Sequence, residues 1–522
     1  MKKIYTILMA LSVIVAGCDK EVQVAEPLKP LSPANIDEDA KNWSLFLITD
    51  LSTQAKLDPP ADVNSDAFKA EIAAVKTAQS NITDKQRESI EYWSGGGILR
   101  WNEIMRELVS KFNLPPAPTN AGTYPAPDAE NPFGDPNFPF ANPPYATRAY
   151  SYASAAQFDA MKIAWRYKYQ YNRPSPYNAD TGVEALMPRT TLPGYPSEDA
   201  VMSGVTAEIL KLMFPAAVEE ITLKAAEQRT AAMLAGKATA SDIKAGLDLG
   251  KAIAAVYIAR AKQDGMSAAA GNPAMWAMLK KNAEDRSEIP WQSLEVPPRP
   301  PMLPFVGLRA FNPTTPGVKA WMLTDEDIES IRPPAPPPTA SEEMAKEVDE
   351  VMYYSKHVTR ERLAIVHKWA DGVGTSTPPG HWCQIAAQYI EEANMSEVRA
   401  ARVFAYLNIA VHDAGIGCWE TKYYYFNPRP TQMNPAIKTA TGIPNFPAYT
   451  SGHSTFSGAA ATVLSYMFPS GSTYFNEQAQ EAMLSRLYGG IHYRSDCQAG
   501  LDHGMRIASY TLAAAQNDGA DN

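Results

Sequence analysis

The segment YTSGHSTFSGAAATVLSYMFP, residues 449–469, is the part of the sequence that most constrains the fold. Ser451 suits the N-cap of a helix, and the alanine-rich run that begins at Gly458 favours a helix continuing through Leu464. A related segment, YPSEDAVMSGVTAEILKLMFP, occupies residues 195–215, which is 254 residues earlier. The two segments share serine, Ser-Gly and Met-Phe-Pro positions, so they predict two copies of one helical unit.

Two further blocks repeat at the same offset. Residues 159–169 and 413–423 share Asp-Ala, a tryptophan and Lys-Tyr, while residues 241–250 and 495–504 share Ser-Asp, Ala-Gly-Leu-Asp and a glycine. Helices share alanine and leucine by chance, but matched tryptophan, tyrosine and aspartate positions argue against coincidence. A repeat of this length indicates an old tandem duplication.

The sequence is rich in helical periodicity and poor in the alternating pattern of strands. Val403, Leu407 and Val411 recur at the spacing of one apolar helix face. We therefore predict an all-α fold of two duplicated helical bundles packed together, with the candidate site in the C-terminal bundle.

Composition along the chain predicts four regions. Residues 1–18 are expected to be a signal, residues 19–285 a degenerate N-terminal helical bundle, and residues 356–516 a C-terminal helical bundle. Between the bundles, the proline-rich region 286–355 predicts an extended connector outside any core. A second proline-rich segment, Pro115–Pro144, predicts a long surface loop within the first bundle.

The bulk composition is that of a folded, acidic protein. Of 522 residues, 45% are hydrophobic and 20% are charged, and the formal net charge is -10. This balance argues against intrinsic disorder, and against a nucleic-acid partner because no basic stripe stands out. Cys383, Cys418 and Cys497 lack CxxC spacing, so neither a disulfide framework nor a zinc site is expected.

The N-terminus resembles a bacterial lipoprotein signal. Lys2 and Lys3 precede an apolar run that ends in Ala16-Gly17-Cys18. Cys18 would then be lipidated, which anchors an exported protein at the cell envelope, on the outer membrane or the periplasmic face. An ordinary signal peptide with an incidental cysteine is the alternative. No later apolar run is long enough to span a bilayer.

Cations, small residues and imidazoles gather between residues 422 and 492. They are Lys422, Arg429, Ser451, Gly452, His453, Arg486 and His492. Guanidinium and ammonium groups bind the oxygens of phosphate or vanadate, and a helix start beside glycine adds backbone N–H groups and space. Two imidazoles can act as ligand, nucleophile or proton-transfer group. Each residue alone is more typical of a cap, a solvated cation or a core histidine, but the set predicts an oxyanion site.

The motifs Lys-x6-Arg-Pro, Ser-Gly-His and Ser-Arg-x5-His resemble the signature of the type 2 phosphatidic acid phosphatase (PAP2) and vanadium-dependent haloperoxidase superfamily. The resemblance implies that the equatorial oxygens of vanadate are held by Lys422, Arg429, Ser451, Gly452 and Arg486. It also implies that His492 is the apical vanadium ligand, or the nucleophile of a phosphatase, and that His453 is the acid–base group. The C-terminal bundle would then be the catalytic one.

The same resemblance assigns aromatic pocket positions to Trp419 and Phe446, and some members of the family have a histidine at the second position. Thr450 departs from the family, which usually has proline before Ser-Gly-His, and this departure implies a change in loop stiffness. Asp371 and Asp413 are candidates to pair with the arginines.

The first copy lacks this set of residues. Where the second copy has Gly-His, the first has Glu198-Asp199, and two carboxylates would repel an oxyanion. Where the second copy has Ser-Arg, we expect Ala235-Gly236 in the first, followed by a short deletion. All seven histidines lie from His357 onward. The first copy is therefore predicted to be structural.

The resemblance implies two enzyme functions. The first is a vanadate-dependent haloperoxidase that oxidises a halide with hydrogen peroxide, which the two-bundle length, Trp419 and the lack of membrane spans favour. The alternative is a soluble acid phosphatase that hydrolyses phosphate esters through a phosphorylated His492 and needs no cofactor. A glycan- or nutrient-binding surface lipoprotein is a third hypothesis, but it does not explain why the cations cluster in one copy. The halide, the organic substrate and the oligomeric state stay open.

Overall fold

The structure is a computed structural model that describes residues 28–113, 143–269, 273–294 and 317–521. The expected signal with Cys18 and most of the Pro115–Pro144 loop lie outside these residues, so both stay predictions. The described residues form helices and connecting segments, with no strand among them, and the all-α prediction is confirmed. Within the same ranges, none of the helices has the apolar length that crossing a bilayer needs.

The helices divide between the two halves of the chain. The first half contains α1 (Leu51–Gln54), α2 (Asp66–Gln79), α3 (Asp84–Ser94), α4 (Gly97–Phe112), α5 (Pro143–Tyr171), α6 (Pro176–Ala179), α7 (Glu198–Met213), α8 (Val218–Leu234), α9 (Ala240–Ala261) and α10 (Pro273–Asp285). The second half contains α11 (Asp325–Ser330), α12 (Glu342–Lys356), α13 (Arg360–Lys368), α14 (Thr377–Glu392), α15 (Glu397–Tyr425), α16 (Pro430–Met433), α17 (Gly452–Met467), α18 (Ser472–Tyr488) and α19 (Arg494–Ala515). Short 3-10 turns are η1 (Glu38–Asn42), η2 (Pro215–Ala217), η3 (Met266–Ala268) and η5 (Pro469–Gly471).

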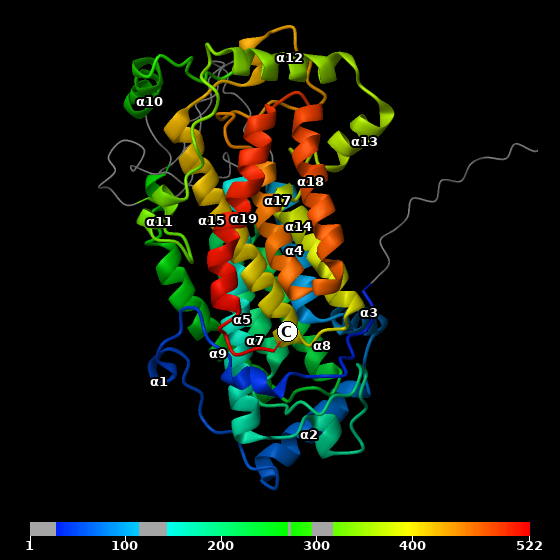
Figure 1. The fold of residues 1–522 in the computed structure, drawn as a ribbon. Coiled ribbons are helices and arrows are strands. Elements are labelled where there is room, and N and C mark those ends of the chain that lie inside the picture. The colour runs from blue at the N-terminus through cyan, green and yellow to red at the C-terminus, as the bar shows by residue number, and fades with distance from the viewer. Residues whose placement is uncertain (1–27, 114–142, 270–272, 295–316, 522) are drawn as a thin grey trace, which may run out of the picture.

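Five pairs of helices recur at the offset found in the sequence. Helices α15 to α19 begin and end 254 residues after α5 to α9, pair by pair. Helices α5 to α9 are drawn in cyan and green and helices α15 to α19 in yellow to red, and the two sets pack against each other (Figure 1). This correspondence supports the predicted duplication, which itself stays a prediction.

The constant offset corrects one detail of the sequence comparison. Because α8 and α9 keep the spacing of α18 and α19, no deletion separates them. Ala231-Ala232 therefore stand opposite Ser485-Arg486, and the expectation that Ala235-Gly236 fill that place is wrong. Ala235-Gly236 correspond instead to Gly489-Gly490, and the second glycine of each pair has a positive φ, 76° and 74°.

A buried ion pair recurs in the two halves. Arg148 Nε donates to Asp264 at 2.6 Å, and Arg402 Nε donates to Asp518 at 2.7 Å. Each of these two guanidinium groups also lies 3.4 Å from a methionine sulfur. Arg148 donates to the last carbonyl of α9, and Arg402 donates to the last carbonyl of α19. The pair thus satisfies a helix C-terminus inside the core of each half.

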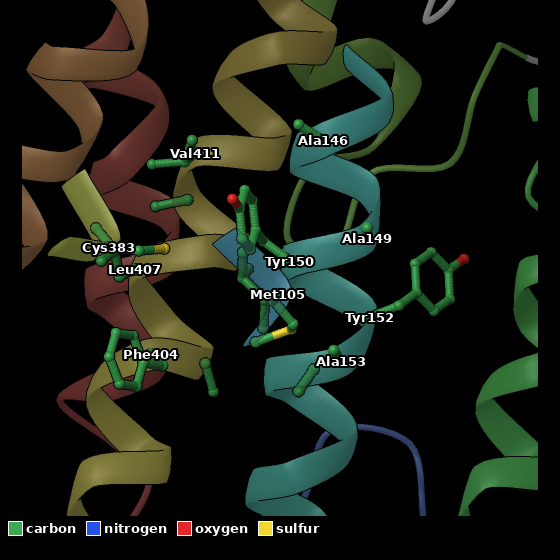
Figure 2. Packing of buried hydrophobic residues seen from close by; sticks show 14 of the residues in the cluster. Met105, Ala146, Ala149, Tyr150, Tyr152, Ala153, Cys383, Phe404, Leu407 and Val411 are labelled. Carbon is green, nitrogen blue, oxygen red and sulfur yellow. The ribbon is translucent and has the colours of Figure 1, made fainter. Parts of the chain in front are cut away.

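Helices α5 and α15 pack side by side at the centre of the molecule (Figure 1). Figure 2 shows Ala146, Tyr150 and Ala153 of α5 beside Leu407 and Val411 of α15. All five side chains are at most 1% exposed. The apolar face predicted on the second of these helices is therefore buried between the two halves, and small alanines let the backbones approach.

The region between the halves differs from the expected extended connector. Residues 317–355 contain α11 and α12 and bury Val318, Ile328 and Met344 in the common core. Side chains of threonine and serine cap both helices, and the prolines at 333–338 lie between them. The prolines follow the end of α11 and do not prevent α12 from forming after them. A high proline content therefore did not mean that the whole region is extended.

Close helix packing next to the candidate site depends on glycine. A Cβ at Gly504 of α19 would lie 2.0 Å from the Thr455 carbonyl of α17. A Cβ at Gly250 of α9 would lie 2.4 Å from the Val201 carbonyl of α7, so both halves use the same contact. Because each contact is with backbone, no side chain can move aside to make room.

Gly504→Ala is expected to lower the free energy of unfolding by about 1–3 kcal/mol, because α17 and α19 must move apart. Urea unfolding followed by circular dichroism measures the change. Gly442→Ala is the matched control, since no atom lies within 4 Å of the added Cβ. Equal effects of the two substitutions would contradict this account of the packing.

Candidate active site

The candidate residues lie at helix ends that meet in the second bundle. Lys422 is near the C-terminus of α15, Arg429 precedes α16, Ser451 caps α17, Arg486 is near the C-terminus of α18, and His492 precedes α19. All five are at most 2% exposed. The structure therefore brings together residues that are up to 70 positions apart in the sequence.

The Lys422 ammonium is held by backbone carbonyls. Its Nζ lies 2.9 Å from the carbonyl oxygens of Pro447 and Ala448 and also contacts that of Thr450. Burial and repulsion from Arg429 lower the pKa of Lys422. Carbonyl oxygens orient the ammonium but leave its charge unneutralised.

Arg429 is held by backbone and by His492. Its Nε donates to the Phe446 carbonyl and its Nη1 to the Ile491 carbonyl, both at 2.9 Å. Nη1 also lies 2.9 Å from Nε2 of His492. The Nη2 group is buried and has no hydrogen-bond partner among the described residues. Burial lowers the pKa of Arg429 to about 10, and an oxyanion beside Nη2 would satisfy the donor and restore the charge balance.

Arg486 reaches the site from α18. Its Nε donates to Ser485 Oγ at 2.8 Å, and its Nη2 donates to the Trp369 carbonyl. Burial lowers the pKa of Arg486 to about 10, although attraction to Asp371 opposes this shift. The guanidinium is thus fixed in place by neutral acceptors.

The three cations share one property, which is the lack of a carboxylate partner. A buried arginine elsewhere in the chain, Arg402, pairs with Asp518 at 2.7 Å. No ion pair of this kind joins Lys422, Arg429 or Arg486 to a carboxylate within the described ranges. Taking a charge out of water costs several kcal/mol, so buried charges are normally paired. The cluster therefore has the charge of a site for an anion.

His492 faces the cations with one nitrogen and Asp496 with the other. Its Nδ1 lies 3.0 Å from Asp496 Oδ2, which also accepts the Tyr493 N–H at 3.0 Å. Burial, then repulsion from Arg429, lowers the pKa of His492, and burial raises that of Asp496. This network assigns the proton of a neutral imidazole to Nδ1 and leaves a lone pair on Nε2. Asp496 thus fixes the tautomer of His492, whereas its neighbour Arg494 binds Glu350.

His453 lies in the first turn of α17 and is partly open to solvent, with 17% of its side chain exposed. Its Nε2 has no hydrogen-bond partner among the described residues and lies 3.8 Å from Asp371 Oδ2. Burial and repulsion from Arg486 lower the pKa of His453. The side chain is therefore a neutral imidazole that lies at the solvent-facing edge of the cation cluster.

Gly452 leaves room at the start of α17. A Cβ there would lie 3.5 Å from the nearest atom, which is ordinary contact, so packing does not require glycine. At Gly458 on the same helix, a Cβ would lie 2.3 Å from the Leu501 carbonyl, so packing does require it. Ser451 caps the helix as predicted. The open space and the first N–H groups of α17 form a cradle that fits an oxyanion.

Trp419 and Phe446, the two predicted pocket aromatics, lie beside the cations. Their ring centroids are 5.1 Å apart, and Nζ of Lys422 lies 5.2 Å from the Phe446 ring. The Arg429 guanidinium lies 5.1 Å from the same ring. The aromatic rings thus line one wall of the cation cluster, where they attract the cations and keep water away.

Asp413 does not pair with an arginine of the site, so that part of the prediction is wrong. Its carboxylate accepts the backbone N–H groups of Trp321 and Met322, each at 2.8 Å. Its counterpart Asp159 accepts backbone N–H groups of residues 46–48 in the same manner. Both aspartates tie an adjacent loop to a central helix.

Asp371 does lie at the site, but its hydrogen-bond partner is a histidine and not an arginine. Nδ1 of His381 lies 3.1 Å and 3.2 Å from the two carboxylate oxygens. The His381 ring stacks on Trp369, with centroids 4.2 Å apart. Sequence reasoning missed both His381 and Trp369, although the confinement of histidine to the second half was a usable signal.

Comparison with known proteins agrees with this geometry. Residues 402–519 match the model of the PAP2 superfamily, a range that contains every candidate residue from Lys422 to His492. No curated protein sequence matches the chain significantly.

Three solved structures with a similar fold are vanadium-dependent haloperoxidases. A bacterial vanadium-dependent iodoperoxidase aligns at 21% identity with a TM-score of 0.54, over 80% of this chain and 95% of its own. The holo-type and apo-type structures of bacterial vanadium-dependent chloroperoxidase each align at 15% identity with a TM-score of 0.50. They cover 78% and 76% of this chain, and 99% and 96% of their own. The predicted resemblance is confirmed: residues 402–519 match the model of the PAP2 superfamily, and the chain has the fold of the vanadium-dependent haloperoxidases.

Proposed function

We propose that this protein is a haloperoxidase-like enzyme that holds vanadate and oxidises a halide with hydrogen peroxide. The observation that carries the proposal is the buried cluster of Lys422, Arg429 and Arg486 around His492, whose cations have no carboxylate partner among the described residues. The fold likeness to an iodoperoxidase and a chloroperoxidase supports it. Vanadate, when bound, supplies a Lewis-acidic centre at which peroxide becomes reactive toward halide.

The cations and His492 would hold the oxyanion from two sides. Arg429 Nη2 is a buried donor that lacks a hydrogen-bond partner within the described residues, and Lys422 and Arg486 add charge beside it. His492 would help to hold the group through Nε2, because its Nδ1 is engaged by Asp496. That bond keeps a lone pair on Nε2, which a metal ligand or a nucleophile needs.

His453 would move protons at the rim of the site. Its neutral imidazole can accept a proton from an incoming hydroperoxyl or hydroxyl group through Nε2. Negative charge in the site favours the protonated imidazole, so the ring can then return the proton to a leaving oxygen. The rings of Trp419 and Phe446 limit access of water to the cations.

A phosphatase acting through His492 is the second candidate. The match of residues 402–519 to the PAP2 superfamily favours it, because this match contains the whole set of candidate residues. In that case the cations bind the phosphoryl oxygens, Nε2 of His492 attacks phosphorus, and His453 protonates the leaving alkoxide. The two functions use the same side chains and differ in whether vanadate must be supplied.

Purified protein incubated with orthovanadate is expected to oxidise iodide or bromide when hydrogen peroxide is added, and protein without vanadate is not. Triiodide absorbance measures the rate. Hydrolysis of a phosphate ester that vanadate inhibits, with no halide oxidation after vanadate loading, would contradict the peroxidase and favour the phosphatase. His492→Ala is expected to lower either activity by more than about 100-fold, since even replacing the hydrogen-bond partner of a metal ligand lowers activity or metal affinity by about 10–100-fold.

Asp199→Ala is the matched control, because Asp199 stands in the first half where His453 stands in the second. It is expected to keep nearly the parent activity. An equal loss in Asp199→Ala and His492→Ala would contradict the assignment of catalysis to the second half.

The first half has a carboxylate where the second half has its cradle. Glu198 stands at the position of Gly452, and its carboxylate lies 2.7 Å from Lys168 and 2.9 Å from Lys237. Lys168 is the counterpart of Lys422 and, like it, donates to a proline carbonyl. Glu198 thus supplies from within the chain the negative charge that the second half must take from outside.

The double variant Glu198→Gly with Asp199→His copies the Gly-His cradle into the first half. It is expected to bind two equivalents of phosphate where the parent binds one, because Lys168 and Lys237 lose their internal counter-ions. Isothermal titration calorimetry counts the sites. Glu198→Gln, which still fills the cradle, is the control and is expected to bind one. A double variant that binds a single equivalent of phosphate would contradict this explanation of why the first half binds no oxyanion.

A further inference from the structure

Asp371 and His381 form a pair at the edge of the candidate site that has no role in the mechanism above. Asp371 lies in the loop between α13 and α14, and His381 lies near the start of α14. Both carboxylate oxygens face Nδ1 of His381, at 3.1 Å and 3.2 Å. Oδ2 of the same carboxylate is 3.8 Å from Nε2 of His453, which is beyond hydrogen-bond reach. The carboxylate therefore lies between two imidazoles and is bonded to His381.

Trp369 supports this pair beside the oxyanion site. The His381 ring stacks on the indole with planes inclined by 19°. The indole Nε1 donates to Glu481 at 2.9 Å, and the Trp369 carbonyl accepts from Arg486. Because Trp369 is fully buried and held at both ends, the His381 ring rests on a fixed surface.

Charged or titratable groups face His453 from each neighbouring element. They are Arg486 of α18, Lys422 of α15, His492 before α19, Asp371 of the α13–α14 loop and His381 of α14. Burial, then repulsion from Arg486 and His381, lowers the pKa of His453. Asp371 is the carboxylate of this set, so the orientation that its hydrogen bonds impose determines how strongly it stabilises a protonated His453.

We propose that His381 is a positioning residue for the acid–base group: it binds both oxygens of Asp371 and so withholds that carboxylate from His453. The inference rests on the proposed function for the acid–base role of His453. With His381 in place, Nε2 of His453 keeps its lone pair and can accept a proton from the incoming hydroperoxyl or hydroxyl group. Without His381, Asp371 turns to His453 and stabilises the imidazolium, which has no lone pair to accept that proton.

Two substitutions separate the hydrogen bond of His381 from its ring. His381→Phe keeps a ring on Trp369 but cannot bind Asp371, whereas His381→Asn keeps a donor near the place of Nδ1 and lacks the ring. Nuclear magnetic resonance of protein labelled with 13C-histidine, without vanadate, gives the pH at which His453 takes up its proton, and His453→Gln assigns the signal. His381→Phe is expected to raise that pH by about one unit or more, and His381→Asn is expected to leave it near the parent value.

Two outcomes of this comparison would overturn the proposal. The first is an unchanged titration of His453 in His381→Phe. The second is the same rise in both variants, which would assign the effect to the ring or charge of His381 instead of its bond to Asp371.

Asp371→Asn is a second test that leaves both rings in place. Because His381 withholds the carboxylate in the parent, the titration of His453 is expected to stay close to the parent value. A fall of about one unit or more would mean that Asp371 already acts on His453, and would overturn the proposal.

The titration is read without turnover, so its result is independent of the haloperoxidase assay. In active protein, the acid limb of the kcat profile against pH is expected to move upward in His381→Phe by the same amount as the titration. A titration that moves while the acid limb stays fixed would support the positioning of Asp371 and contradict the acid–base role of His453.

Discussion

Burial of positive charge without a partner is the constraint on which the site depends. Lys422, Arg429 and Arg486 are at most 1% exposed and bind neutral carbonyl or hydroxyl oxygens, which orient the cations without neutralising them. Such a cluster is stable only if an anion completes it or if its pKa values fall, and burial lowers all three. The first half meets the same constraint differently, because Glu198 places a carboxylate on Lys168. This contrast is the reason why we propose an external oxyanion for the second half alone.

The scaffold that imposes this constraint is common to both halves. Asn408 donates to Ser154 at 2.9 Å, so two residues that are 254 positions apart touch each other where α5 meets α15. Contact between equivalent positions is what a two-fold relation between halves produces. The glycine contacts at Gly250 and Gly504 repeat as well, and both bring a helix onto the backbone of its neighbour. The two halves therefore share their packing contacts, whereas the residues at the position of the proposed oxyanion site differ.

Much of the site could be predicted because its residues follow local rules. The helix cap at Ser451 and the motif spacing from Lys422 to His492 leave marks in the sequence. Contacts with backbone groups leave no such mark in the sequence. The role of Asp413 was missed because its partners are N–H groups far along the chain, which any residue can offer. The stack of His381 on Trp369 was missed because it depends on where the residue that follows α13 lies against α14. The core contribution of residues 317–355 was missed because their prolines fall between helices.

The location of a bound oxyanion tests the central claim most directly. Crystals soaked in sodium tungstate and measured at a tungsten absorption edge reveal that location by anomalous scattering. The expected result is one dominant peak in the second half, within hydrogen-bond distance of Arg429 Nη2 and Arg486, in front of Gly452 and next to Nε2 of His492. A dominant peak elsewhere, or an empty cradle in crystals that bind tungstate at other places, would contradict the assignment of these buried cations to an oxyanion site.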